Sequence, residues 1–415
     1  MTLDYSSHPS ELVEGGEVQG VKKMVTVDDL KKAIPAHCFK TSYTKALGYL
    51  ARDFLVVALL GAAAWTYIPQ LESRLARYAA WLLYGYFQGL AFTGVWVEGH
   101  ECGHMAFSPS HRLNDFIGFI LHSALLTPYF AWKSTHRRHH IYANNLAKDH
   151  NYVPPQKEEY AQSLMFNSNT EKLEELTEDV PFVTLMRIVM QQILGFPWYL
   201  LSNITASPGS LYRKQSSSFL GNSHFLPSST LFRPEEAHLI LASDIGIGIV
   251  AYGLYLASLR WGFSAVALLY IQPYMWVNHW IVAITYLHHT SPQVPKYQPE
   301  AWTFMKGALA TVDREFGWVG KHMLHNIIEY HVIHHLFSRI PQYHAEEATK
   351  AIMPLLGDSY RQEKQRYFLP ALYEAFTTCQ WIESDQVADP KERAYWYKAG
   401  PSPPPERSMG KRSWT

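Results

Sequence analysis

Cysteine and charge are both scarce in this chain. Its 415 residues include only three cysteines, Cys38, Cys102 and Cys379. They are odd in number and far apart, which predicts neither a disulfide framework nor a thiolate zinc site. A reducing, cytosol-facing setting is expected for the polar parts. Charged residues make up 17% of the chain, and 36 basic residues balance 36 acidic ones. The net charge therefore points to no nucleic-acid partner.

Both ends of the chain are polar. Residues 1–32 contain no apolar core near their start, so a cleaved secretory signal is not expected. Asp28 and Asp29 open a short helix that should end at Ile34, before Pro35. A proline-rich stretch at 401–405 predicts a disordered end. No segment recurs with a period of 20–50 residues, which excludes a repeat array.

Apolar and aromatic residues are abundant instead. The hydrophobic fraction is 47%, with 13 Trp and 26 Tyr, and these two residue types favour membrane interfaces. A spanning helix needs about 20 apolar residues. Four stretches approach this length as two predicted hairpins: 54–68 (extended by 46–50 if Arg52 reaches the interface), 78–97, 239–259 and 263–287. The expected fold is all-α, an integral membrane bundle of about four spanning helices.

Two further apolar stretches do not fit a simple span. Residues 116–130 are too few and are interrupted by His122, so this segment is expected to lie in or re-enter the membrane. Residues 182–201 are expected to be broken by Gly195 and Pro197 and to lie at the interface or against the bundle. Residues 202–234 are rich in Ser, Pro and Gly and predict a loop.

Histidine is the residue type that points to chemistry, with 21 copies. Residues at i, i+3 and i+4 share a helix face, so a cluster with this spacing is expected to aim its imidazoles at a common point. Imidazole binds iron, copper, zinc or nickel. Eight clustered histidines exceed what one zinc ion uses, so two metals fit better. The three clusters are His100–His104 (HECGH), His136–His140 (HRRHH) and His331–His335 (HVIHH).

Simpler interpretations explain the clusters less well. A single helical histidine is usually a surface or hydrogen-bonded core residue, but the HxxHH pattern occurs twice here. HECGH also matches the HExxH pattern of zinc proteases, but Gly103 would weaken that helix and the other clusters would have no role. Zinc has no redox chemistry, whereas a di-iron centre activates oxygen. Unactivated C–H bonds in a membrane are a natural target for such a centre.

The hairpins place all three clusters on one side of the membrane. Lysines concentrate before the first predicted span, and Lys133, Arg137 and Arg138 flank the second cluster, so this side is expected to be cytosolic. Both termini are then cytosolic, and the histidines form a cytosolic metal-binding cap. Three parts are predicted: a polar N-terminal arm, 1–45, a membrane domain, 46–355, and a cytosolic C-terminal tail, 356–415.

The three clusters, in this order and between these apolar stretches, resemble those of the membrane-bound fatty acid desaturases, and more narrowly the delta-12 (oleate) desaturases of fungi and plants. The most specific stretches are 100–108, 121–133, 284–290 and 307–352. The resemblance implies oxygen-dependent insertion of a cis double bond, converting oleoyl to linoleoyl on a phospholipid. It also implies two iron ions, electrons from cytochrome b5 and its reductase, and the endoplasmic reticulum membrane.

The resemblance also implies a ninth ligand, His289, with His288 as the competing candidate. Asn278 lies about three helical turns earlier, and either shares this face or makes an interhelical hydrogen bond. His325 and Asn326 match the family, and a structural role fits them equally well. Three carboxylates either accept imidazole N–H groups or are simply solvated: Glu101, Asp149 and Glu329. The implied metal ligands are His100, His104, His136, His139, His140, His289, His331, His334 and His335.

The chain has no electron-transfer module of its own. His8-Pro9-Ser10 lacks the glycines of the haem motif found in fused cytochrome b5 domains, and no dinucleotide fingerprint is present. A separate donor is therefore expected. Four basic residues near the second cluster are expected either to steer an acidic partner such as cytochrome b5 or to contact lipid phosphates: Lys133, Arg137, Arg138 and Lys148.

Some residues beside the clusters depart from the family pattern, namely Met105 and the run 141–145. Such positions distinguish desaturase, hydroxylase, acetylenase and conjugase outcomes. These outcomes, and an omega-3 regioselectivity, therefore stay open. A related membrane oxidase of alkanes or sterols, and a non-catalytic protein that stores or senses metal, are further alternatives.

Overall fold

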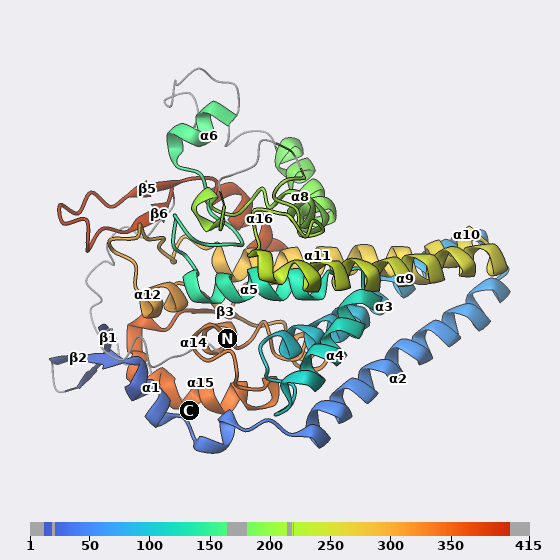
Figure 1. Ribbon diagram of the computed structural model, residues 1–415, viewed down its shortest axis with the longest axis horizontal. Coiled ribbons are helices and arrows are strands. Elements are labelled where there is room, and N and C mark those ends of the chain that lie inside the picture. Colours follow the sequence, from blue (N-terminus) through green and yellow to red (C-terminus); the bar gives the residue numbers. More distant parts are fainter. Residues whose placement is uncertain (1–11, 19–20, 164–180, 214–217, 219, 399–415) are drawn as a thin grey trace.

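A computed structural model describes residues 12–18, 21–163, 181–213, 218 and 220–398. Helices dominate it, as predicted, and four long ones run side by side toward one end of the molecule (Figure 1). These are α2 (Tyr43–Tyr67), α3 (Arg74–Gly103), α9 (Ala237–Trp261) and α11 (Gln272–His289). Three small two-stranded sheets accompany the helices among the described residues, and the mostly helical structure is consistent with the predicted all-α class.

Two helices in the described part of the chain are long and apolar enough to cross a membrane, Tyr43–Gln70 and Pro234–Trp261. They carry the predicted spans 54–68 and 239–259. Large apolar side chains remain exposed on both, among them Leu59 on α2 and Ile249 on α9, at 60% and 67%. A core helix of a soluble domain would bury such residues, so these surfaces are suited to lipid.

The other two predicted spans are also helical, but they lie largely inside the bundle. Residues 78–97 belong to α3, and residues 263–287 run through α10 (Phe263–Val266), a π-helical turn (Ala267–Ile271) and α11. Gly85 and Gly89, one turn apart on α3, allow α11 to approach closely. A Cβ on Gly89 would lie 2.3 Å from the Cβ of Trp276. Small residues at this spacing are a common basis of close helix packing in membranes.

The structure resolves both shorter apolar stretches into helices, and one expectation about them, the break in residues 182–201, was wrong. Residues 116–130 are not one segment, because α4 (His111–Ala124) and α5 (Tyr129–Tyr142) are separated by a turn in which Leu126 has a positive φ of 51°. Residues 182–201 are not broken, because α8 (Pro181–Ser202) continues through Pro197 and packs against α11 and α16 (Phe368–Thr378). Packing on α11 and α16 compensates for the backbone hydrogen bond that Pro197 removes from α8.

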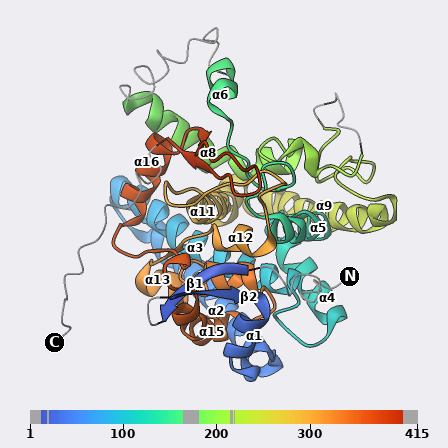
Figure 2. The ribbon, with the colours of Figure 1, turned by 90° about the vertical axis from the view of Figure 1, so that its left-hand side faces the viewer.

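The N-terminal segment folds against the C-terminal half of the chain. Strands β1 (Leu12–Val18) and β2 (Val21–Thr26) form an antiparallel hairpin that leads into α1 (Val27–Ala33). The predicted short helix is thus present, with Thr26 and Asp29 forming its capping box. The 3₁₀ turn Ala36–Phe39 (η2) follows and packs on α15 (Gln342–Leu356). Figure 2 shows α1, β1, β2 and α15 grouped on one side of the molecule.

The C-terminal segment also packs on the domain as far as residue 398. Helix α16 contacts α8 and α11, and β5 (Ile382–Ser384) pairs with β6 (Tyr395–Tyr397). The side chains of Trp381 and Tyr397 are fully buried. The predicted disordered stretch 401–405 lies outside the described residues. The domain boundaries at 45 and 355 stay a prediction.

The remaining elements are short connections around the histidine clusters and at the surface. They are η3 (Ile68–Gln70), α6 (Lys157–Ser163), η4 (Pro208–Ser210), η5 (Pro234–Glu236), α12 (Phe304–Leu309), β3 (Asp313–Arg314), α13 (Gly317–His322), α14 (His331–Leu336), η7 (Gly357–Ser359) and β4 (Gln362–Glu363).

Candidate metal centre

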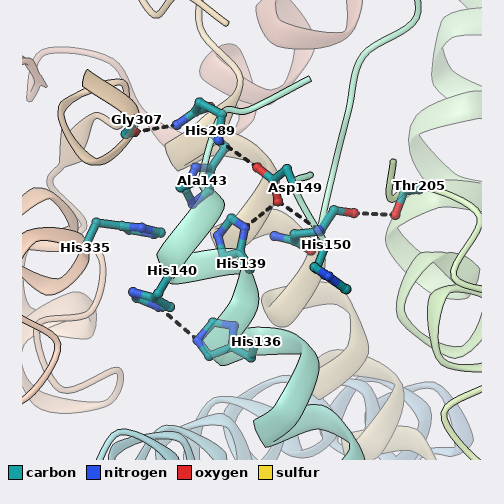
Figure 3. A network of polar contacts seen from close by, with 12 residues as sticks. His136, His139, His140, Ala143, Asp149, His150, Thr205, His289, Gly307 and His335 are labelled. Atoms are coloured by element: carbon teal, nitrogen blue, oxygen red, sulfur yellow. Dashed lines mark hydrogen bonds and ion pairs between the residues drawn. The ribbon is translucent and has the colours of Figure 1, made fainter. Parts of the chain in front are cut away.

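Four helices bring the nine predicted ligands into one buried region. Helix α3 contributes the first cluster in its last turn and at its C-cap, and α5 contributes the second. Helix α11 ends at the ninth histidine, and α14 consists almost entirely of the third cluster. All nine imidazoles are largely enclosed by protein. Figure 3 shows five of them side by side: His136, His139, His140, His289 and His335.

The nine histidines form two groups rather than three. In the five-histidine group, one ring nitrogen from each residue lies within 4.8 Å of all the others. In the four-histidine group, three residues meet the same limit. The fourth, His331, has its Nε2 atom 3.2 Å from Nε2 of both His289 and His335. The five-histidine group is His100, His104, His136, His140 and His334, and the four-histidine group is His139, His289, His331 and His335.

Each HxxHH cluster is therefore split between the groups, and the expectation that each converges on one point was wrong. The first and last histidines of a cluster stay together, whereas the middle one turns to the other group. On an α-helix, positions i+3 and i+4 lie on opposite sides of position i, about 100° apart. This angle sends His139 and its neighbour His140 to different groups, and it separates His334 from His335 in the same way.

The arrangement of nitrogen atoms fits bound cations. His100 and His104 have their Nε2 atoms 3.3 Å apart, and those of His136 and His140 are 3.1 Å apart. The buried Nε2 of His334 has no hydrogen-bond partner among the described residues. An imidazole must be neutral to bind a metal. Burial and neighbouring imidazoles keep five of them neutral by holding the pKa well below 6.5: His136, His140, His331, His334 and His335.

One of the three predicted carboxylate acceptors clearly orients a ligand. Asp149 accepts a hydrogen bond from Nδ1 of His139 at 2.7 Å (Figure 3). Glu101 is 3.5 Å from Nδ1 of His100 and also accepts from the backbone N–H of Gln342. Glu329 is buried and accepts instead from the backbone N–H of Phe316, so it matches neither of the two alternatives, an imidazole acceptor or a solvated carboxylate.

The choice between His288 and His289 follows from their partners. The nitrogens of His288 face two backbone carbonyls, Ile284 at 2.5 Å and Ile328 at 2.9 Å. His289 faces the four-histidine group instead. Asn278 is buried and donates to the carbonyl of Tyr274 in its own helix, so the described contacts of its amide group are not interhelical.

His325 has a structural position between helices. Its Nε2 lies 2.6 Å from Asp53 of α2, and its Nδ1 lies 3.5 Å from Glu98 of α3. His325 and Asn326 both have positive φ, at 54° and 62°. Asp53 and Glu98 were not among the residues predicted from the sequence. A carboxylate within or beside an apolar run is itself a signal, because such residues face the protein interior and pair there.

Two further residues near the four-histidine group were missed. Asn144, with φ of 61°, donates its backbone N–H to Asp149 at 2.7 Å and its side chain to the carbonyls of Gly307 and Ala310. Lys296 is 1% exposed and donates to Asn144 Oδ1 and to the backbone carbonyl of His289. Burial lowers the pKa of Lys296 to about 8. No local pattern marks either residue, because their partners are distant in sequence.

The basic neighbourhood predicted around the second cluster is only partly at the surface. Arg138 is buried, donates to the carbonyl of Leu231 at 2.6 Å and packs over the ring of Tyr212, so it is unsuited to docking. Lys133 pairs with Asp115. Lys148 is exposed, and Arg137 is half-buried.

An apolar cavity adjoins both histidine groups. It lies between α3 and α5 on one side and α8 and α11 on the other. One histidine from each group lines it, His136 and His139, and its walls include Trp132, Phe196 and Ile281. A largely apolar cavity with a few polar groups at one place is typical of a site for a hydrophobic ligand.

Comparison with known proteins identifies desaturases and a hydroxylase of fatty acyl chains. The pattern of the fatty acid desaturase family matches residues 73–367. The Delta(12)-fatty-acid desaturase of Arabidopsis thaliana is 39% identical over 397 residues, covering 96% of this chain and 97% of the relative. The omega-6 endoplasmic reticulum desaturase of Brassica juncea is 40% identical over 372 residues (90% and 91%). The oleate hydroxylase of Claviceps purpurea is 39% identical over 370 residues (86% and 77%).

Proposed function

The chain belongs to the fatty acid desaturase family and is an oxygen-dependent oxidoreductase, and we propose that it inserts a cis double bond at the delta-12 position of an oleoyl chain carried by a phospholipid. The cavity beside His136 and His139 is the observation that carries this proposal, because it gives an acyl chain access to both histidine groups. The desaturases of Arabidopsis thaliana and Brassica juncea support the regioselectivity.

We assign one iron ion to each histidine group, with His100, His104, His136, His140 and His334 around one and His139, His289, His331 and His335 around the other. When bound, the iron pair supplies oxygen activation for the removal of two hydrogens from the acyl chain. The protein holds the ligands in place, through Asp149 behind His139 and Lys296 behind His289.

The cavity walls would position the chain and exclude water. Trp96 and Trp132 lie on the histidine side, and Phe196 of α8 faces Ile281 and Tyr286 of α11 across the space. Apolar walls favour a methylene chain and leave few polar groups that could hold water beside the reacting carbons. The gap between α8 and α11 would thus set how far the chain enters.

Hydroxylation at the same centre is the second candidate, and the Claviceps purpurea relative favours it. Met105 has a positive φ of 62° directly after His104, and Asn144 supports Asp149. Both stand where the sequence departs from the family pattern. Because the two reactions differ in product, analysis of the acyl chains separates them.

We further propose four spanning helices within a membrane domain of residues 46–355, with both termini on the cytosolic side of the endoplasmic reticulum. The exposed apolar faces of α2 and α9 support two of the spans. The tightly packed pair α3 and α11 would supply the other two, and their histidine-bearing ends point to the same region.

The reaction needs two external electrons, and we propose cytochrome b5 and its reductase as the donors. Cytochrome b5 is acidic, so a basic surface would steer it. Arg137 and Lys148 are suited to this role, whereas buried Arg138 is not.

Expression of the full chain in yeast fed with oleate tests the proposed function. We expect a diene with double bonds at positions 9 and 12, esterified in phospholipid. A hydroxylated product would support the second candidate, and an unchanged acyl profile with full iron content would contradict both.

A further inference from the structure

A second group of potential metal ligands lies away from the two histidine groups. His37 and Cys38 belong to the turn η2, and His344 and Glu347 belong to α15. One ligand atom from each of these four residues lies within 4.8 Å of the others. His37 and Glu347, from the two halves of the group, are 310 residues apart in sequence, so no local spacing could reveal it.

The separations are those expected around a tetrahedral ion. Zinc binds sulfur at about 2.3 Å and nitrogen or oxygen at about 2.0–2.2 Å, which places neighbouring ligand atoms roughly 3.3–3.6 Å apart. The measured values scatter around this range: His37 Nε2 to Glu347 Oε2 is 2.8 Å, Cys38 Sγ to His37 Nε2 is 3.8 Å, and His344 Nδ1 to Glu347 Oε2 is 4.0 Å.

A surface ion pair between His37 and Glu347 would explain the positions of these two residues, but not why Cys38 and His344 lie beside them. Both of these side chains are about half exposed, at 55% and 50%, so their pairing contributes little by itself. Cys38, in contrast, is completely buried and has its sulfur near the same point. The ring of His344 lies against that of His37 with centroids 5.3 Å apart.

We propose that His37, Cys38, His344 and Glu347 bind one zinc ion. A thiolate, two imidazoles and a carboxylate form a ligand set that suits zinc, and four protein ligands leave no open position for a substrate. The site is therefore structural. Binding would release the thiol proton of Cys38 to solvent as the sulfur becomes a ligand. The proposal departs from the prediction made from cysteine spacing alone, that no thiolate zinc site is present, because one cysteine would be completed by three other residues.

The ion would fasten the N-terminal segment to the helix that follows the third histidine cluster. A buried apolar core joins the same segments, with Leu30 and Ile34 in one cluster with Ala348 and Ile352. The backbone N–H of Ser42 donates to the hydroxyl of Tyr343 at 2.8 Å, and the ring of Phe39 packs edge-on against Phe337, with centroids 5.8 Å apart. Phe337 directly follows α14, which carries three members of the histidine groups. Figure 2 shows that α1 and α15 lie next to each other at this point.

Metal analysis of the full chain, purified in detergent from cells supplied with zinc and iron, tests the proposal. We expect about one zinc per chain in addition to iron. Cys38→Ser and Glu347→Gln should each lose the zinc and keep the iron. The matched controls are Cys379→Ser, a buried cysteine elsewhere, and Glu346→Gln, a neighbour paired with Lys350. Both controls should keep the zinc.

Cobalt substitution gives a second readout that does not depend on activity. A thiolate bound to cobalt produces a charge-transfer absorption, which should appear in the parent chain and in Cys379→Ser and vanish in Cys38→Ser. If Cys38→Ser fails to fold, Glu347→Gln still decides the matter, because its half-exposed side chain has no packing role. A parent chain without zinc and without the cobalt–thiolate band would reduce the group to an ion pair. Zinc that persists in both variants would place the ion elsewhere.

Discussion

Asp149 joins two parts of the metal centre, because one of its oxygens accepts a hydrogen bond from Nδ1 of His139 and the other accepts from the backbone N–H of Asn144, both at 2.7 Å. A carboxylate in this position fixes the tautomer and the direction of the imidazole.

Asp149→Asn should therefore reduce iron affinity or turnover by about 10–100-fold, the range found when such supporting groups are removed. Iron content and product formation measure the effect. Asp115→Asn is the matched control, since Asp115 pairs with Lys133 away from the ligands. Equal behaviour of the two variants would show that Asp149 does not orient His139.

The neighbours His288 and His289 provide a sharp comparison. His289→Ala removes a member of the four-histidine group, so iron should fall well below two per chain and product should vanish. His288→Ala removes contacts to two backbone carbonyls and should leave the bound iron intact. Iron analysis after purification at equal expression checks this. Loss of iron in His288→Ala alone would reverse the assignment.

Packing of α3 on α11 should be sensitive to one methyl group. A Cβ on Gly89 would meet Trp276 at 2.3 Å and the carbonyl oxygen of Pro273 at 3.0 Å. Gly89→Ala should destabilise the protein by about 1–3 kcal/mol, the usual cost of overpacking. Gly48→Ala on α2 is the control, because nothing lies within 4 Å of its Cβ position. Thermal melts in detergent should therefore show a lowered midpoint for Gly89→Ala only.

The pairing of His325 with Asp53 predicts a pH-dependent stability. Burial alone would lower the pKa of His325, but the carboxylates of Glu98 and Asp53 outweigh it, and the pKa is raised above 6.5. A group whose folded-state pKa is raised stabilises the protein below its unfolded pKa, and this stabilisation is lost as the pH rises through the folded pKa.

Melts at a series of pH values from about 6 upward should thus show a falling midpoint for the parent chain and a smaller fall for Asp53→Asn. An identical pH profile for both proteins would exclude a charged His325.

The two arginines of the second cluster should respond differently to substitution. Arg137→Glu should slow turnover with cytochrome b5, and salt should change the size of this effect, because it acts on encounter with an acidic donor. Arg138→Ala should instead destabilise the fold, since it removes donors to the carbonyls of Leu231 and Ser210. Initial rates at several ionic strengths, with iron content as the control, distinguish the two. A salt-independent effect of Arg137→Glu would count against steering.

The sequence was sufficient to predict which histidines gather, because HxxHH is rare enough to stand out. It could not predict how they sort into two groups, since that depends on how α5 and α14 face each other across α3 and α11. Asn144 and Lys296 were missed for the same reason: their roles depend on contacts with Asp149 and His289 that only the fold creates.

The positions of the long helices were predicted from the sequence, but their continuity and some of their contacts were not. Hydropathy located the four long helices, because apolar runs of this length have few alternatives. The expected break at Pro197 was wrong, since packing on α11 outweighs local propensity. The polar N-terminal segment gave no sign that Cys38 would lie beside His344.

The histidines of α5 and α14 connect the two histidine groups, because neighbouring histidines on each helix belong to different groups. Each of these helices supplies ligands to both groups, so a helix that shifts to release one ion also pulls a ligand from the other. If one ion occupies each group, we expect loading to be cooperative, with few half-filled chains. Without the ions, α3, α5, α11 and α14 would lose the ligand bonds that connect them, so we expect the unloaded state to be less rigid. We therefore expect the unloaded chain to be cleaved by proteases more readily than the loaded one.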